Sequence, residues 1–168
     1  MKRLLLPTAL GLAALAITSC ATTSLVQVWR DPNYSPAPVK RVFVVAVIPY
    51  PQDRLYFENA IAESLTRKGF EVATSSGVVP PDLSDNDTIV AYVKEMGVDL
   101  VVVLRLVTPY GAWYGATDIN VYAAKTNSEW PVWSGTSNTV TFSTAQEAAT
   151  SVAASLVYGL IKAHILVR

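Results

Sequence analysis

Two apolar segments without hydrophobic alternation constrain the fold of this chain most strongly. Residues 41–48 read RVFVVAVI, and residues 100–104 read LVVVL. A half-buried strand alternates apolar and polar side chains, whereas short β-branched runs of this kind are typical of strands buried on both faces. The chain must therefore cover both faces of its sheet around these two strands.

The residues between the two runs have the hydrophobic spacing of helices. An amphipathic helix is predicted over 53–68, and Gly69 stands where a left-handed C-terminal cap belongs. Its inward positions are Phe57, Ala60, Ile61 and Leu65. A short strand at 71–75 and a loop precede a second helix that Gly97 closes, with inward positions Ile89, Val93 and Met96. The order β-α-β-α-β calls for parallel strands and right-handed crossovers.

The second half of the chain no longer alternates strands with helices. Residues 117–125 and 132–140 are predicted as two strands joined around 126–129. A final amphipathic helix is predicted over 145–165, and Ser143 or Thr144 with Gln146 or Glu147 gives a capping box in either register. A length of 168 residues suits one core. The expected fold class is a single α/β domain, a mixed β-sheet (β-α-β-α-β, then hairpin and C-terminal helix) with helices packed on the sheet.

The first twenty residues have the parts of a bacterial secretory signal. A basic start at Lys2 and Arg3 is followed by a short apolar stretch and then by small residues. The apolar stretch is shorter than the roughly 20 residues that a membrane-spanning helix needs. An N-terminal anchor that is never cleaved is the alternative reading.

Residues 17–20, ITSC, resemble the lipobox of bacterial lipoproteins. That resemblance implies that residues 1–19 are removed and that Cys20 is acylated, for example with palmitate, and becomes the first mature residue. Cys20 is also the single cysteine of the chain, and a free structural thiol is the alternative. Cys20 is followed by Ala21 and not by the aspartate that resembles an inner-membrane retention signal. In a Gram-negative host the expected location is therefore the outer membrane, with the protein facing the periplasm.

The residues after Cys20 are expected to form a short tether. Residues 20–38 are assigned as the lipidated N-terminus and tether, and residues 39–168 as the globular domain. Within the tether, the alternation from Leu25 to Trp29 predicts a candidate edge strand. Trp29 is expected to be buried there, because exposing so large an apolar side chain to water costs free energy. If this segment docks, the domain lies close to the membrane, and Trp29→Ala should cost about 2–4 kcal/mol of stability.

The side chains that could act as catalytic groups or metal ligands do not form a catalytic, metal or cofactor site in the sequence pattern. One cysteine and one histidine cannot build a zinc site, and His164 falls in the last turn of the final helix. Asp82, Asp85 and Asp87 lack the glycine and the distant glutamate of a calcium loop. Glu58 and Glu63 are five residues apart, so they do not share a helix face. Equal numbers of basic and acidic residues, 13 of each, give no footprint for nucleic acid.

The segment Tyr110-Gly111-Ala112-Trp113-Tyr114-Gly115 stands out because three aromatic residues share a short stretch with two glycines. It follows a buried strand, at the end where ligands of open α/β sheets often bind. One reading is that the rings cover the edge of the sheet. The other is that Tyr110, Trp113 and Tyr114 contact a protein partner or a glycan, in which case Trp113→Ala weakens capture while the fold is kept.

Several motifs together resemble a group of small bacterial lipoproteins. They are the lipobox, WRDP at 29–32, the apolar strand at 42, Phe57-Glu58 in a helix that ends RKG at 67–69, GVD at 97–99, and WPVWSG at 130–135. The element order is similar to that of the TolB amino-terminal domain, the curli export lipoprotein and the outer-membrane activator of a peptidoglycan synthase. The resemblance implies a binding or assembly module rather than an enzyme.

Two departures narrow what the resemblance implies. No long alternating insert is present that could add membrane-spanning strands, so a pore is not expected. The tether is also short, so a long-reach activator is not expected. The sequence therefore predicts a lipid-anchored, non-catalytic module that binds an envelope protein near the membrane. A small-ligand or glycan-binding lipoprotein is the alternative, and an envelope hydrolase is the least favoured.

Overall fold

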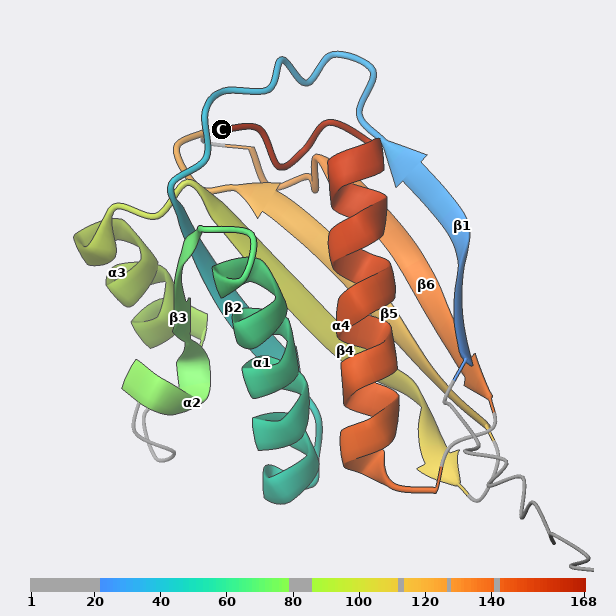
Figure 1. The fold of residues 1–168 in the computed structure, drawn as a ribbon. Coiled ribbons are helices and arrows are strands. Elements are labelled where there is room, and N and C mark those ends of the chain that lie inside the picture. Colours follow the sequence, from blue (N-terminus) through green and yellow to red (C-terminus); the bar gives the residue numbers. More distant parts are fainter. Residues whose placement is uncertain (1–21, 79–85, 112–113, 127, 141–142) are drawn as a thin grey trace, which may run out of the picture.

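The computed structural model describes residues 22–78, 86–111, 114–126, 128–140 and 143–168. Six strands form one mixed sheet in the order β1-β6-β5-β4-β2-β3, with helices packed against it (Figure 1). The strands are β1 (Thr22–Arg30), β2 (Arg41–Val47), β3 (Glu71–Thr74), β4 (Leu100–Gly111), β5 (Tyr114–Ala123) and β6 (Trp133–Val140). The helices are α1 (Pro51–Thr66), α2 (Ser75–Val78), α3 (Asn86–Met96) and α4 (Ala145–Lys162). The predicted fold class, a single mixed α/β domain, is confirmed.

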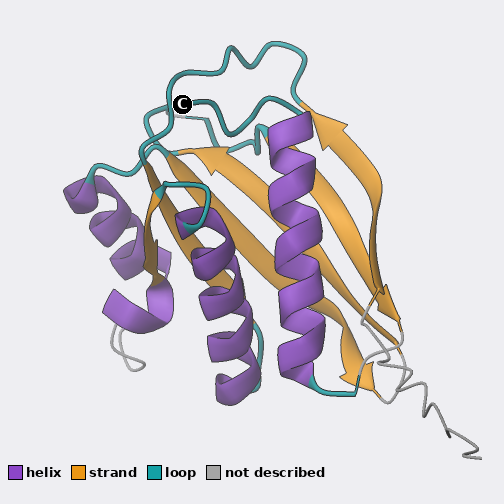
Figure 2. Cartoon of the chain, in the orientation of Figure 1, coloured by secondary structure: helices purple, strands orange, loops and turns teal. Residues whose placement is uncertain are grey.

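The β-α-β-α-β half forms as the non-alternating runs predict. β2 pairs in parallel with both β3 and β4, and β4, β5, β6 and β1 pair antiparallel in that spatial order. β2 is buried on both faces because α1 and α4 cover one face of the sheet, while α3 packs against Phe43 and Val45 on the other. Figure 2 shows α1 and α4 side by side across the same face.

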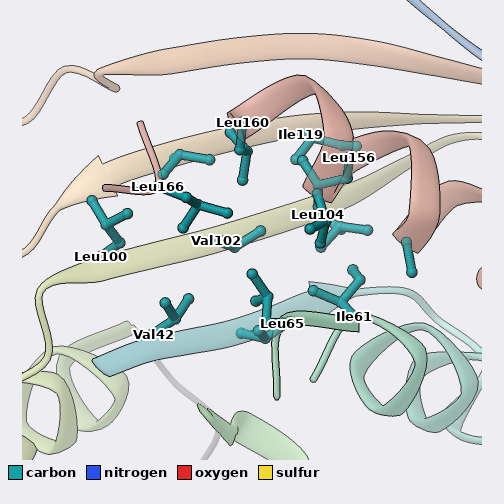
Figure 3. Packing of buried hydrophobic residues seen from close by; sticks show 14 of the residues in the cluster. Val42, Ile61, Leu65, Leu100, Val102, Leu104, Ile119, Leu156, Leu160 and Leu166 are labelled. Atoms are coloured by element: carbon teal, nitrogen blue, oxygen red, sulfur yellow. The ribbon is translucent and has the colours of Figure 1, made fainter. Parts of the chain in front are cut away.

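The main core lies between that face of the sheet and the helices α1 and α4. Figure 3 shows Val42, Leu100, Val102 and Leu104 of the central strands pointing toward Ile61, Leu65, Leu156 and Leu160 of the helices. Several side chains of α4 that face the sheet are small, including Ala148, Ala149 and Ala153, all fully buried. Small side chains at these positions let α4 pack closely against its neighbours in the core.

The predicted cap residues Gly69 and Thr144 are confirmed, whereas α1 spans 51–66 rather than 53–68 and α4 ends at Lys162 rather than at residue 165. Gly69 has φ +84°, the left-handed conformation that glycine adopts without steric cost after α1. At the start of α4, Thr144 is the N-cap, and its side chain accepts a hydrogen bond from the Glu147 backbone N–H at 3.1 Å. The Glu147 carboxylate in turn accepts hydrogen bonds from the backbone N–H and the Oγ of Ser143, the residue before the N-cap, each at 2.8 Å. Local sequence therefore sets where these helices stop and start.

The segment Leu25–Trp29 lies in β1, an edge strand that pairs with β6, as expected, but the prediction that Trp29 is buried is wrong. Trp29 is 45% exposed. The reason is a bulge: Gln27 has φ +51°, and the register with β6 shifts between Val26 and Trp29. An extra residue in one strand changes which side chains point inward, so the simple alternation fails at this point. Among the tryptophans that the structure describes, Trp133 in β6 is the fully buried one.

The loop between β4 and β5 is shorter than the aromatic segment 110–115 suggests, because most of that segment belongs to the two strands. β4 continues to Gly111 and β5 begins at Tyr114, with Gly111 opposite Tyr114 in an antiparallel hairpin. Tyr110 and Tyr114 are therefore backbone members of strands. Trp113 lies outside the described residues, so its exposure stays a prediction.

Candidate interaction surfaces

An open groove of about 540 Å³ lies between β1 and α4. Its lining residues are Thr23, Leu25 and Val28 from the strand, and Ser155, Tyr158, Gly159, Lys162 and Ala163 from the helix and its C-terminal end. A Cβ atom on Gly159 would stand 2.7 Å from Leu25 Cδ1, so the end of the Leu25 side chain packs directly against this glycine at the base of the groove. A glycine inside a helix costs about 1 kcal/mol relative to alanine, and this close approach is the compensating reason.

The two walls of the groove carry large exposed apolar side chains. Tyr158 is 68% exposed and Val28 is 52% exposed, and Trp29 and Ile161 lie on the same two elements. Large apolar groups that remain in water next to a groove are typical of surfaces that bind another molecule. Lys162 is the single charged residue among the described residues that line the groove. The groove is therefore mostly apolar, with one cation near the C-terminal end of α4.

The strand wall of the groove is also the edge of the sheet. β1 is the terminal strand of the six, so its outer side has no neighbouring strand among the described residues. Near its start the Thr23 carbonyl accepts a hydrogen bond from Ser155 Oγ at 3.2 Å, which covers one edge group. The bulge at Gln27 interrupts the edge farther along. Edge backbone groups that remain unpaired can accept an added strand, so this wall offers hydrogen bonds as well as apolar contact.

The sequence did not identify this groove. The detectable signals were Gly159 in the middle of an otherwise helical segment and Tyr158 beside it. Neither signal shows which strand the helix meets, because β1 lies about 130 residues earlier in the chain.

A buried carboxylate, Glu58, is the second feature that sequence reasoning missed. Its Oε1 accepts hydrogen bonds from Ser75 Oγ at 2.6 Å, from the Ala46 N–H at 2.9 Å and from Arg54 Nε at 3.2 Å. Its Oε2 accepts one from the Ser76 N–H at 2.8 Å. Glu58 is fully buried, and each oxygen has a partner, so the cluster joins α1 to the ends of β2 and β3. The available signal was Arg54 one helical turn before Glu58.

At the opposite end of the sheet, Asp99 joins three strands. Its Oδ2 accepts the backbone N–H groups of Lys40 at 2.7 Å and Arg41 at 2.8 Å, and its other oxygen pairs with Lys125. Partial burial opposes ionisation, but the hydrogen bonds from Lys125 and from the two backbone groups outweigh it, and they hold the pKa of Asp99 at about 2. The carboxylate is therefore ionised at neutral pH and positions the starts of β2 and β4.

The remaining candidate residues that the structure describes do not converge on a catalytic site. His164 is exposed in the turn after α4 with φ +54°. Among the residues that the structure describes, no group of three His, Cys, Asp or Glu side chains could hold a metal ion. Cys20 lies outside the described residues, and so do Asp82 and Asp85. None of the described helices is long and apolar enough to cross a bilayer.

Comparison with known proteins identifies the fold. No family model matches the sequence, and no curated protein matches it. Among solved structures, the PelC dodecamer from Paraburkholderia phytofirmans is similar over 81% of this chain and 94% of its own, with TM-score 0.53 and 15% identity. Lipoprotein GNA1162 from Neisseria meningitidis covers 76% of this chain and 96% of its own at TM-score 0.47 and 12% identity. TolB from Acinetobacter baumannii is similar over 84% of this chain and 31% of its own, with TM-score 0.45 and 12% identity.

Proposed function

We propose that this chain is a lipid-anchored cell-envelope protein that binds another protein close to the membrane and has no catalysis of its own. The N-terminal pattern that ends in Cys20 supports the anchor. In a Gram-negative host the protein would belong to the outer membrane and face the periplasm. Among the described residues, the absence of converging catalytic groups is compatible with a binding module.

The observation that best supports this function is the groove between β1 and α4. It combines an unpaired sheet edge, among the described residues, with exposed apolar side chains on both walls. An extended protein segment can satisfy both features at once, because its backbone pairs with an edge strand while alternate side chains enter apolar pockets. A small polar ligand would use neither feature. The ligand of the groove is therefore proposed to be a protein chain.

The same surface is suited to assembly with further copies. PelC, which has this fold, forms a dodecamer. Anchoring in one membrane raises the effective concentration of neighbouring copies, so even weak contacts through the groove would be populated. Self-assembly and binding of a different envelope protein are two forms of the proposed function, and one experiment separates them.

The test is site-specific photo-crosslinking in intact cells. A photoreactive phenylalanine analogue replaces Tyr158 in the groove or, as a matched control, Val90 on α3, which is 48% exposed. We expect a discrete light-dependent adduct from position 158 that is absent from position 90 and is reduced by Val28→Asp. An adduct of twice the monomer mass indicates self-assembly, and another mass indicates a different partner. Equal labelling at both positions, or no adduct at position 158, would refute the groove as the binding surface.

A further inference from the structure

The register of the sheet shows at which end of the molecule the N-terminal segment joins the domain. Thr22 at the start of β1 is opposite Val140 at the end of β6, and Val140 is opposite Tyr114 at the start of β5. We call this the anchor end: the start of β1, the carboxyl ends of β2, β4 and β6, and the first turns of α1 and α4 (Figure 1). Cys20 precedes Thr22 by two residues, which span about 7 Å at most. An acyl chain on Cys20 would therefore hold this end at the bilayer.

Exposed apolar side chains surround the anchor end. They come from separate segments: Tyr50 and Leu55 at the start of α1, Val47 at the end of β2, Val107 in the second half of β4, and Val140 at the end of β6. Tyr50, the N-cap residue of α1, is 56% exposed and has an apolar ring with a polar tip. Aromatic rings of this kind favour the headgroup region of a membrane.

Four ion pairs among the described residues lie at the other end of the molecule, each with at least one exposed member. They are Lys40–Glu71, Arg41–Glu71, Lys125–Asp99 and Arg67–Glu63. Charged residues nearer the anchor end include Arg54, which pairs with the buried Glu58, and Glu147, which caps α4, together with Asp53 and Arg105. Charged groups are costly in the interior of a bilayer, so the placement of the exposed ion pairs favours contact between lipid and the anchor end.

We propose that the anchor end lies on the bilayer and that Tyr50, with the exposed valines at positions 47, 107 and 140, enters the lipid interface. This inference rests on the proposed anchor at Cys20 and adds which surface of the domain faces lipid. The mature chain has a slight excess of acidic groups, so attraction to anionic headgroups does not drive the contact. The apolar rim contributes instead, and the domain takes a fixed orientation rather than turning on its tether.

The test uses spin labels on the acylated protein in vesicles of phosphatidylethanolamine and phosphatidylglycerol. Acylation consumes the thiol of Cys20, so a cysteine introduced elsewhere is the single labelling site. Labels are placed with Tyr50→Cys and Val107→Cys and, as a control, with Trp130→Cys, because Trp130 is 79% exposed in the segment between β5 and β6. We expect labels at 50 and 107 to collide several-fold less with a water-soluble nickel reagent, and more with oxygen, than the label at 130.

The outcomes separate the orientation from the anchor. A protein that floats with vesicles but has equal nickel accessibility at 50, 107 and 130 would overturn the orientation and leave the anchor intact. A protein that is not acylated and does not float would overturn both. Circular dichroism of each labelled variant checks that the fold is kept, which is expected because all three positions are exposed.

Discussion

At the scale of single residues, Glu58 shows how a charge is kept inside the fold. Four donors surround its two oxygens, and Arg54 supplies the opposite charge at 3.2 Å. Removing Glu58 leaves a partly buried cation and buried backbone N–H groups without their acceptor, which costs more than the pair itself contributes. The cluster therefore fixes the position of α1 against β2 and the short helix α2.

We expect Glu58→Ala to lower the free energy of unfolding by about 3 kcal/mol, because Arg54 and the Ala46 and Ser76 N–H groups lose their acceptor. The control is Glu63→Ala on the same helix. Glu63 forms an exposed pair with Arg67, and such pairs contribute about 0–1 kcal/mol. Urea denaturation of the two variants measures the difference, and equal losses would contradict the structural role of Glu58.

At the scale of elements, β1 is part of the sheet rather than a free tether. It pairs with β6 along most of its length, and Leu25 packs against the core beneath Gly159 of α4. The bulge at Gln27 then turns Trp29 partly into water. The strand is therefore fixed to the domain by Leu25 and by its backbone, and Trp29 contributes less than its size suggests.

Trp29→Ala should consequently destabilise the domain by about 1 kcal/mol, below the roughly 2–4 kcal/mol expected for a buried ring. Trp133→Ala provides the matched comparison, because Trp133 is fully buried in the neighbouring strand and should cost about 3–5 kcal/mol. Thermal unfolding of both variants in a soluble form of the chain compares them. If the two substitutions have equal effects, the bulge does not set the exposure of Trp29.

At the scale of the whole molecule, the protein has two ends with different surfaces. The anchor end carries exposed apolar residues such as Tyr50 and Val140, the far end carries exposed ion pairs, and the groove between β1 and α4 runs along one side. With the anchor end on the bilayer, as proposed, the groove would stay accessible to a partner protein. Lipid and a partner protein would then bind different surfaces at the same time.

Cys20→Ser tests the anchor on which this arrangement depends. The variant lacks the thiol that an acyl chain would modify, so we expect no incorporation of labelled fatty acid and release of the protein from the membrane fraction. Circular dichroism should be unchanged, because the sheet begins at Thr22. Continued acylation of the variant would contradict the assignment of Cys20.

The sequence by itself determined the elements whose signals are local. The non-alternating runs specified two doubly buried parallel strands, helical spacing specified α1, α3 and α4, and Gly69 and Thr144 marked helix ends. These features depend on side-chain periodicity and on backbone groups within a few residues, so they are readable without knowing the fold.

Tertiary structure decided the features that join distant residues. Glu58 is buried because Ala46, Ser75 and Ser76 converge on it, and the groove forms where α4 lies beside β1, a strand from the other end of the chain. Trp29 is exposed because one residue at Gln27 changes the register of an edge strand. In each case the outcome depends on which segments become neighbours. Local periodicity does not encode that choice, because it is fixed only when the sheet and the helices pack together.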